Sequence, residues 1–181
     1  MSGNQKMTKD LAIMAFFAAL TAICSQIQIP LPYIPINLAL FSVHLCGILL
    51  GSKRAVLSQS VYLLLGLIGL PVFAGFKGGP GVLFGKTGGY IIGYLLCALI
   101  DGLIAGKDDA SALRMVLQML AGTFFCYLFG TIWFMFLTRM SLALSLSYCV
   151  IPFIPGDIIK IVRAALLGKR LAPQLRHYQF I

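Results

Sequence analysis

Long apolar runs, separated by short polar or glycine-rich connectors, dominate the chain. We place six membrane spans at about residues 10–29, 37–51, 55–70, 87–105, 113–137 and 152–167. About 20 apolar residues in a helix cross the hydrocarbon core of a bilayer. The pattern predicts an all-α integral membrane protein with a single membrane domain, residues 1–181.

Composition agrees with a membrane protein. The 181 residues are 60% hydrophobic and only 10% charged, far outside the range of soluble domains. The first apolar run lacks a small-residue cleavage site, so we interpret it as a span and not as a signal peptide. The five cysteines are dispersed without a CxxC pair, and we expect buried, unpaired thiols.

The basic residues are distributed unevenly between the two sides that six spans define. Nine of the 14 lysines and arginines lie on the side of the termini: Lys6, Lys9, Lys53, Arg54, Lys107, Arg114, Lys169, Arg170 and Arg176. Only Lys77, Lys86 and Arg139 lie on the other side. The positive-inside rule therefore predicts cytoplasmic N- and C-termini. The net charge of +9 comes from basic residues that orient the protein in the membrane. It does not indicate a nucleic-acid partner.

The connector at residues 71–86 is rich in glycine and faces outside in this topology. Residues 69–94 carry Gly69, Gly75, Gly78, Gly79, Gly81, Gly85, Gly88, Gly89 and Gly93. The connector also carries apolar residues, among them Phe73 and Phe76, which a flexible polar linker would lack. We expect an ordered loop whose residues 75–86 gate a pocket, with unpaired N–H groups at Gly88 and Gly89 where the next helix begins.

Asp157 and Lys160 are the charged pair of the last span. Residues three apart share one face of a helix. An ionised side chain in a span costs about 2.5–3.5 kcal/mol on insertion scales and usually faces protein or water. We favour a ligand site at this pair, with a structural ion pair as the alternative. Arg163, one turn further, is expected to snorkel to the cytoplasmic interface.

Other polar residues leave alternatives open. Gln26, Gln28 and Asn37 flank a proline-rich connector, where they either line a pocket or supply ordinary interfacial polarity. Asp101 is expected near Lys53 or Arg54.

His44 is expected to be a satisfied core histidine, because no second His or Cys at helical spacing completes a metal site with it.

The segment PGVLFGKT at residues 80–87 nearly matches a phosphate-binding loop. Its first position is Pro80 where the pattern requires glycine, no strand precedes it, and it faces outside. We do not interpret it as a nucleotide site.

Span one carries small residues at helical spacing, in the pairs Ala15–Ala19 and Ala18–Ala22. Such pairs allow another helix to approach closely. The approaching helix belongs either to a partner subunit or to this protein itself.

The motifs GLPVFAG, GG-x-G, TGGY and the span-six PGD-x-x-K together resemble the BioY family of energy-coupling-factor (ECF) biotin transporters. The resemblance implies an S-component fold, the bacterial cytoplasmic membrane and biotin as substrate. It also implies a transmembrane coupling (T) subunit, which meets the alanine face, and two ABC ATPase subunits. Lys86 departs from the family, which often has proline before TGGY.

We accordingly expect a non-enzymatic subunit without cofactor or metal that binds biotin near the outer face. The expected substrate residues are Asp157, Lys160, Phe73, Gly75, Lys77, Gly78, Gly79, Lys86, Gly88, Gly89, Tyr90, Gln26 and Asn37. The expected partner residues are Ala15, Ala18, Ala19 and Ala22. The alternatives are a subunit for another small vitamin or a self-sufficient carrier. No HExxH or GxSxG motif supports an enzyme.

Overall fold

The structure is a computed structural model that describes residues 3–104 and 111–177, and it is mostly helical. The helices are α1 (Gly3–Gln26), α2 (Ala39–Leu50), α3 (Ser52–Leu67), α4 (Pro80–Leu83), α5 (Gly88–Asp101), α6 (Ala112–Thr138), α7 (Leu142–Cys149) and α8 (Ile154–His177). A 3-10 turn, η1 (Gly102–Ile104), follows α5. Two short strands, β1 (Gln28–Ile29) and β2 (Ile36–Asn37), lie between α1 and α2.

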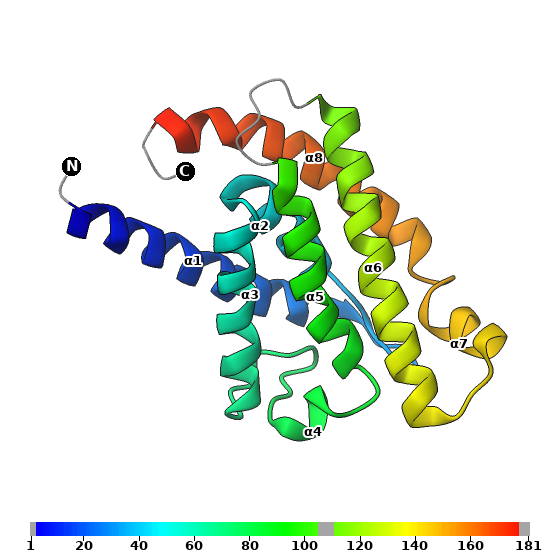
Figure 1. The fold of residues 1–181 in the computed structure, drawn as a ribbon. Helices are drawn as coiled ribbons and strands as arrows, with labels where there is room; N and C mark the ends of the chain where they lie inside the picture. Colours follow the sequence, from blue (N-terminus) through cyan, green and yellow to red (C-terminus); the bar gives the residue numbers. More distant parts are fainter. Residues whose placement is uncertain (1–2, 105–110, 178–181) are drawn as a thin grey trace.

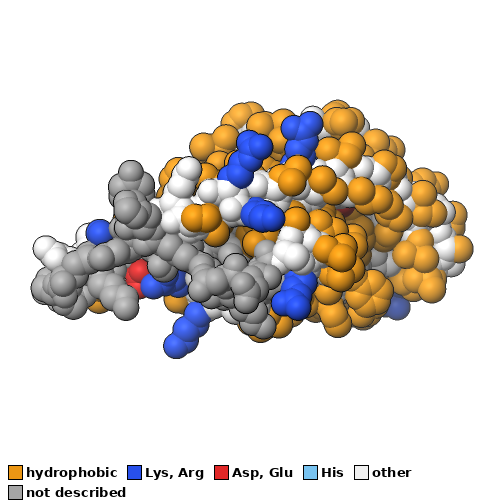
Figure 2. Space-filling model, turned by 90° about the horizontal axis from the view of Figure 1, so that it is seen from above, with side chains coloured by type: hydrophobic (Ala, Val, Ile, Leu, Met, Phe, Trp, Pro, Cys, Tyr) orange, Lys and Arg blue, Asp and Glu red, His pale blue; other side chains and the backbone are white. Residues whose placement is uncertain are grey.

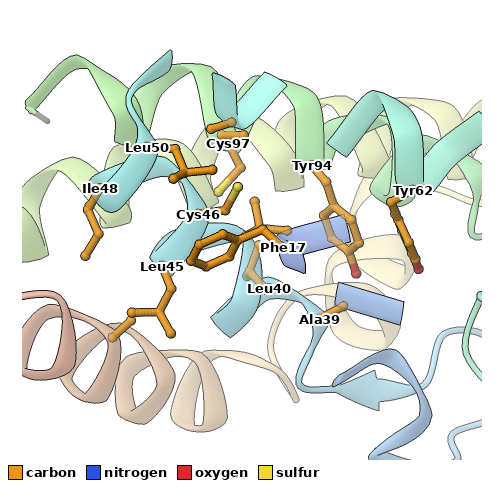
Figure 3. Close-up of a cluster of buried hydrophobic side chains, with 14 of the residues drawn as sticks. Phe17, Ala39, Leu40, Leu45, Cys46, Ile48, Leu50, Tyr62, Tyr94 and Cys97 are labelled. Atoms are coloured by element: carbon orange, nitrogen blue, oxygen red, sulfur yellow. The ribbon is translucent and has the colours of Figure 1, made fainter. Parts of the chain in front are cut away.

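Helix α2 is the centre of the bundle. It contacts α1, α3, α5 and α8, and all of its residues except Phe41 are buried. In Figure 1, α3, α5 and α6 stand side by side, while α1 and α8 cross them obliquely. A helix that is apolar on nearly every side is suited to this position, since most of its surface meets protein. Figure 3 shows the core around it, where Leu40, Leu45 and Cys46 of α2 lie near Phe17 and Cys97.

A helix occupies most of each of the six predicted apolar runs. By length and composition, two described helices could each cross a membrane, Met7–Gln26 and Ala112–Thr138. Helices α7 and α8 add a third candidate if this pair, bent by 52°, forms one span. Helices α2 and α5 are apolar but shorter.

The structure adds elements outside the predicted spans. Residues 138–150, which connect the last two predicted spans, contain α7, whose N-terminus is capped by Ser141. The proline connector closes into an antiparallel pair that joins Gln28 to Asn37 and Ile29 to Ile36. Helix α8 continues past residue 167 to His177. The polar turn expected at residues 106–110 lies outside the described residues.

Asp101 lies in the core and not beside the basic turn, so the predicted pairing with Lys53 or Arg54 is wrong. Its Oδ2 atom is 2.6 Å from Nδ1 of His44, and both side chains are fully buried. Arg54 pairs instead with Asp10, at 2.9 Å. The expectation of a satisfied core histidine is confirmed, because His44 Nε2 also lies 3.3 Å from the hydroxyl of Thr123.

Cys97 joins this buried cluster, and its thiol donates to Asp101 Oδ2 at 3.4 Å. The donor atoms of His44, Cys97 and Asp101 lie within 4.8 Å of one another. The short contact between His44 and Asp101 is a hydrogen bond and not a pair of metal ligands held apart by an ion. The thiols of all five cysteines are unpaired and buried, as predicted.

Candidate functional site

A cavity of about 260 Å³ opens at the end of the bundle where the glycine-rich loop lies. Helices α5, α6 and α8 supply most of its helical lining, single residues come from α2, α3, α4 and α7, and the rest comes mainly from the β1–β2 connector and the loop. Its lining residues are Gln28, Pro30, Leu31, Pro32, Tyr33, Ile34, Pro35, Asn37, Leu40, Tyr62, Phe73, Ala74, Gly75, Lys77, Val82, Thr87, Tyr90, Ile91, Tyr94, Cys126, Tyr127, Cys149, Phe153, Asp157 and Lys160. A mostly apolar hollow with a few convergent polar groups is the usual form of a small-molecule site.

The polar floor of the cavity is the pair Asp157 and Lys160. Lys160 Nζ donates to Asp157 Oδ1 at 2.7 Å, and both residues are buried, with exposed fractions of 7% and 4%. The hydroxyl of Tyr127, from α6, donates to the second carboxylate oxygen, Oδ2. Each carboxylate oxygen of Asp157 therefore has a donor, which compensates for the loss of water around this buried group.

Two amide side chains carry unused hydrogen-bonding capacity at the cavity. Gln28 Oε1 is buried and has no partner among the described residues. Asn37 Oδ1 accepts from the N–H of Ala39 at 3.0 Å and so supports the start of α2. No hydrogen bond to another described residue occupies the Asn37 NH₂ group. An unpaired buried acceptor costs free energy unless a ligand donates to it.

Aromatic rings form the side walls. Tyr90 and Tyr127 meet edge to face at 6.2 Å between ring centroids, and Tyr127 meets Phe153 at 6.5 Å. The Tyr90 hydroxyl is 2.9 Å from Thr131 Oγ1, so its polar end is satisfied on α6 while its ring borders the cavity. Such walls suit a flat, apolar ligand ring.

A tight hairpin at residues 73–77 covers the mouth. Phe73 and Lys77 exchange two backbone hydrogen bonds, of 2.9 and 3.2 Å. The turn between them holds Gly75 at φ 75° and Phe76 at φ 55°, a left-handed conformation that favours glycine at the first of these positions. The ring of Phe73 is buried against Tyr62, at 5.5 Å.

Two neighbouring side chains at the end of α1 hold the hairpin. Ser25 Oγ donates to the Val72 carbonyl at 2.6 Å, and Gln26 makes several bonds. Gln26 Nε2 donates to the carbonyls of Val72 and Phe73 at 3.2 and 3.1 Å, and its Oε1 accepts from the N–H of Phe76 at 2.9 Å. Gln26 therefore acts on the loop and does not border the cavity.

The structure brings seven of the expected substrate residues to the cavity: Asp157, Lys160, Phe73, Gly75, Lys77, Tyr90 and Asn37. Outside its lining lie Gln26, Gly78, Gly79, Lys86, Gly88 and Gly89. Lys86 is near the mouth, with Nζ 5.4 Å from the ring centroid of Tyr33.

The glycines outside the lining serve close packing and turning. A Cβ at Gly78 would collide with the Leu70 carbonyl, and one at Gly89 with the side chain of Trp133. Gly79 has φ 92°. The expectation of an unpaired N–H at Gly88 is wrong, because this N–H donates to the Gly85 carbonyl at 3.0 Å. Of residues 75–86, which were expected to gate a pocket, Gly75, Lys77 and Val82 border the cavity, and the gate itself stays a prediction.

The alanines expected to meet a partner divide between two faces of α1. Ala15 and Ala19 are exposed. Ala18 is buried in the core, with an exposed fraction of 2%, so its assignment to a docking surface is corrected. Ala22 is partly buried and packs against the same core.

Sequence reasoning missed most of the aromatic lining, including Tyr33, Tyr62, Tyr94, Tyr127 and Phe153. Tyr127 is the most informative of these, because an ionised Asp157 inside a span requires further donors. That requirement predicts a donor but does not say which helix supplies it.

The chain resembles known proteins over nearly its whole length. The model of the BioY family matches residues 1–177. A probable biotin transporter BioY from Pyrococcus horikoshii is 38% identical over 163 residues, which cover 90% of this chain and 96% of the relative. The biotin transporter BioY of Thermotoga maritima is 39% identical over 163 residues, covering 90% and 95%.

A solved structure gives the class of the fold. The crystal structure of the S-component for biotin from an ECF-type ABC transporter superposes with a TM-score of 0.85 at 33% identity, covering 94% of each chain. The fold is therefore that of a membrane-embedded S-component. Together with the family match, this shows that the chain belongs to the BioY family.

Proposed function

We propose that this protein binds biotin at high affinity and delivers it across the cytoplasmic membrane as the S-component of an ECF transporter. The observation that carries the proposal is the cavity with Asp157 and Lys160 on its floor, in a chain of the BioY family. Relatives of this chain are biotin transporters, and the superposed S-component is one for biotin.

The cavity offers partners for each part of biotin. The ureido group has two N–H donors and one carbonyl, and biotin also has a thioether ring and a carboxylate tail. Asp157 and Gln28 Oε1 are acceptors for N–H groups, while Lys160 and Lys77 are donors to oxygen. The aromatic walls cover the ring system.

We further propose six spans with both termini in the cytoplasm. Figure 2 looks onto the end of the molecule opposite the cavity, where Lys and Arg side chains gather among hydrophobic ones. The described basic residues of this end include Lys53 and Arg54 at the start of α3, Arg114 early in α6, and Lys169 and Arg170 late in α8. This distribution follows the positive-inside rule and directs the cavity outward.

The partners in this proposal are a transmembrane coupling subunit and two ABC ATPases, which supply the energy while this chain catalyses no reaction. The exposed alanines Ala15 and Ala19 fit the coupling subunit, because small side chains permit close helix contact.

Biotin binding to the purified protein tests the ligand. Asp157→Asn and Lys160→Met are each expected to weaken biotin binding at least tenfold in calorimetry, since truncating one partner of a buried charge pair costs about 2–5 kcal/mol. Lys169→Met, on the same helix but away from the cavity, is the matched control and should bind as the wild type does. Unchanged affinity in both cavity variants would mean that Asp157 and Lys160 do not bind biotin.

Transport measurements with the assembled complex test the partner surface. Ala15→Trp and Ala19→Trp should abolish uptake because their bulk prevents close approach, while biotin still binds the isolated subunit. Loss of biotin binding in both variants would instead mean that this face of α1 supports the fold of the subunit.

A further inference from the structure

A second hollow, of about 630 Å³, lies between α2 and α8 on the side of the bundle. Its apolar lining is Leu38, Phe41, Ile159, Leu166 and Leu167. Its remaining lining residues are all basic: Lys160, Arg163 and Arg170. We call it the lateral groove. It shares Lys160 with the cavity, so this side chain forms part of the wall between the two.

Two positive charges in the lateral groove have no counter-charge in the described part of the chain. Arg163 and Arg170 are both exposed. Each carboxylate of the described residues is already paired elsewhere: Asp10 with Arg54, Asp101 with His44, and Asp157 with Lys160. An arginine at membrane depth is costly unless an anion or water meets it.

Along α8 the groove begins with Ile159 and Lys160 and ends with Arg170, and Leu166 and Leu167 lie between Arg163 and Arg170. Arg163 and Arg170 are seven residues apart, so they share one face of α8 and are separated by about 10 Å along its axis. Ile159 lies one turn deeper than Arg163, on the side away from the basic end of the molecule. Leu38 and Phe41 continue the apolar lining on the facing helix.

We propose that the lateral groove binds one anionic phospholipid of the cytoplasmic leaflet. Its phosphate lies between Arg163 and Arg170, and an acyl chain follows Ile159, Leu38 and Phe41 towards the bilayer centre. Basic pockets between spans on the cytoplasmic side commonly take anionic head groups. Near the basic end of the groove α8 packs closely on α2, because a Cβ atom at Gly168 would collide with the side chain of Ile48. The proposal does not depend on the identity of the vitamin.

Native mass spectrometry of the purified full chain with added phosphatidylglycerol or phosphatidylcholine tests this proposal. The wild type should retain phosphatidylglycerol preferentially, and an excess of inorganic phosphate should not displace it. Arg163→Gln and Arg170→Gln should each weaken retention about fivefold, and the double variant about 25-fold, which corresponds to about 1 kcal/mol per basic residue.

The double variant Lys53→Gln, Lys169→Gln is the matched control. It removes the same charge from the same end of the molecule, outside the groove, and should retain the lipid as the wild type does. Equal loss in this control, or equal retention of phosphatidylcholine by the wild type, overturns the proposal in favour of non-specific attraction. Thermal unfolding checks that all variants are folded.

A photo-crosslinker at Leu166 in membranes that contain the complete transporter identifies the occupant of the groove. Crosslinking to phospholipid supports the proposal. Crosslinking to a protein subunit overturns it, because the groove would then be a subunit interface.

Discussion

Two buried acid–base pairs lie in one small bundle, and they differ in what surrounds them. The Asp157–Lys160 contact is 2.7 Å and the Asp101–His44 contact is 2.6 Å, and all four residues are buried. Asp157 and Lys160 border a cavity. Asp101 is enclosed, and neither Gly47 nor Gly122 beside it has room for a Cβ atom. The Asp157–Lys160 pair thus borders a cavity, whereas the Asp101–His44 pair is enclosed by tightly packed residues.

The two pairs also differ in which helices they join. Asp157 and Lys160 are on one helix, so their contact needs no tertiary fold, although Tyr127 of α6 completes it. His44 of α2 and Asp101 of α5 come from different helices, and Thr123 of α6 touches His44 as well. We infer that the enclosed pair holds three helices together, while the pair at the cavity is available to a ligand. The predictions below test that division.

The largest effect is expected on stability, at the enclosed pair. Asp101→Ala leaves His44 without its acceptor in the core and should lower the free energy of unfolding by about 3–5 kcal/mol. Asp157→Ala should cost clearly less, because water in the cavity can solvate Lys160. Equilibrium unfolding of both variants in micelles measures the difference. Equal destabilisation would mean that both pairs are structural.

A smaller effect is expected on binding, at the hydroxyl of Tyr127. Tyr127→Phe removes the O–H that donates to Asp157 and should weaken biotin binding by about 1.5–3 kcal/mol, the contribution of a hydrogen bond to a charged group. Tyr148→Phe, which removes a partly exposed hydroxyl on α7, is the control. If both variants bind biotin with wild-type affinity in calorimetry, Tyr127 does not orient the carboxylate for the ligand.

The smallest effect is expected on kinetics, at the mouth. Gln26→Leu removes the bonds from Gln26 to Phe73 and Phe76 and so loosens the hairpin at residues 73–77, while Ser25 of α1 still holds Val72. It should raise the biotin dissociation rate about fivefold, which corresponds to about 1 kcal/mol, the contribution of a typical hydrogen bond. Gln118→Leu, which removes the 2.6 Å bond to the Ile100 carbonyl at the opposite end, is the control.

A cysteine at Lys77 reports the hairpin directly. Thiol labelling of Lys77→Cys should fall when biotin is added, and the five native thiols are buried and give little background. The same labelling with and without biotin would make the hairpin a passive connector.

The local sequence pattern determined the helices, the proximity of Asp157 and Lys160, and the family resemblance. A helix occupies most of each predicted apolar run, because an apolar segment in a bilayer must satisfy its backbone hydrogen bonds internally and a helix does so. The proximity of Asp157 and Lys160 followed from their spacing of three residues, since helical geometry is local. The family resemblance depended on short motifs and agrees with the match over residues 1–177.

Tertiary structure decided what no local pattern contains. Asp101 contacts His44, which is 57 residues away in the sequence, and Asp157 accepts a hydrogen bond from Tyr127, which is 30 residues away. Ala18 is buried in the core, although Ala15 and Ala19 on the same helix are exposed. Periodicity shows which residues share a face, but only packing against other helices decides which face meets protein, ligand or lipid. Helix formation depends on neighbours in sequence, whereas a cavity and its polar partners depend on contacts between distant segments.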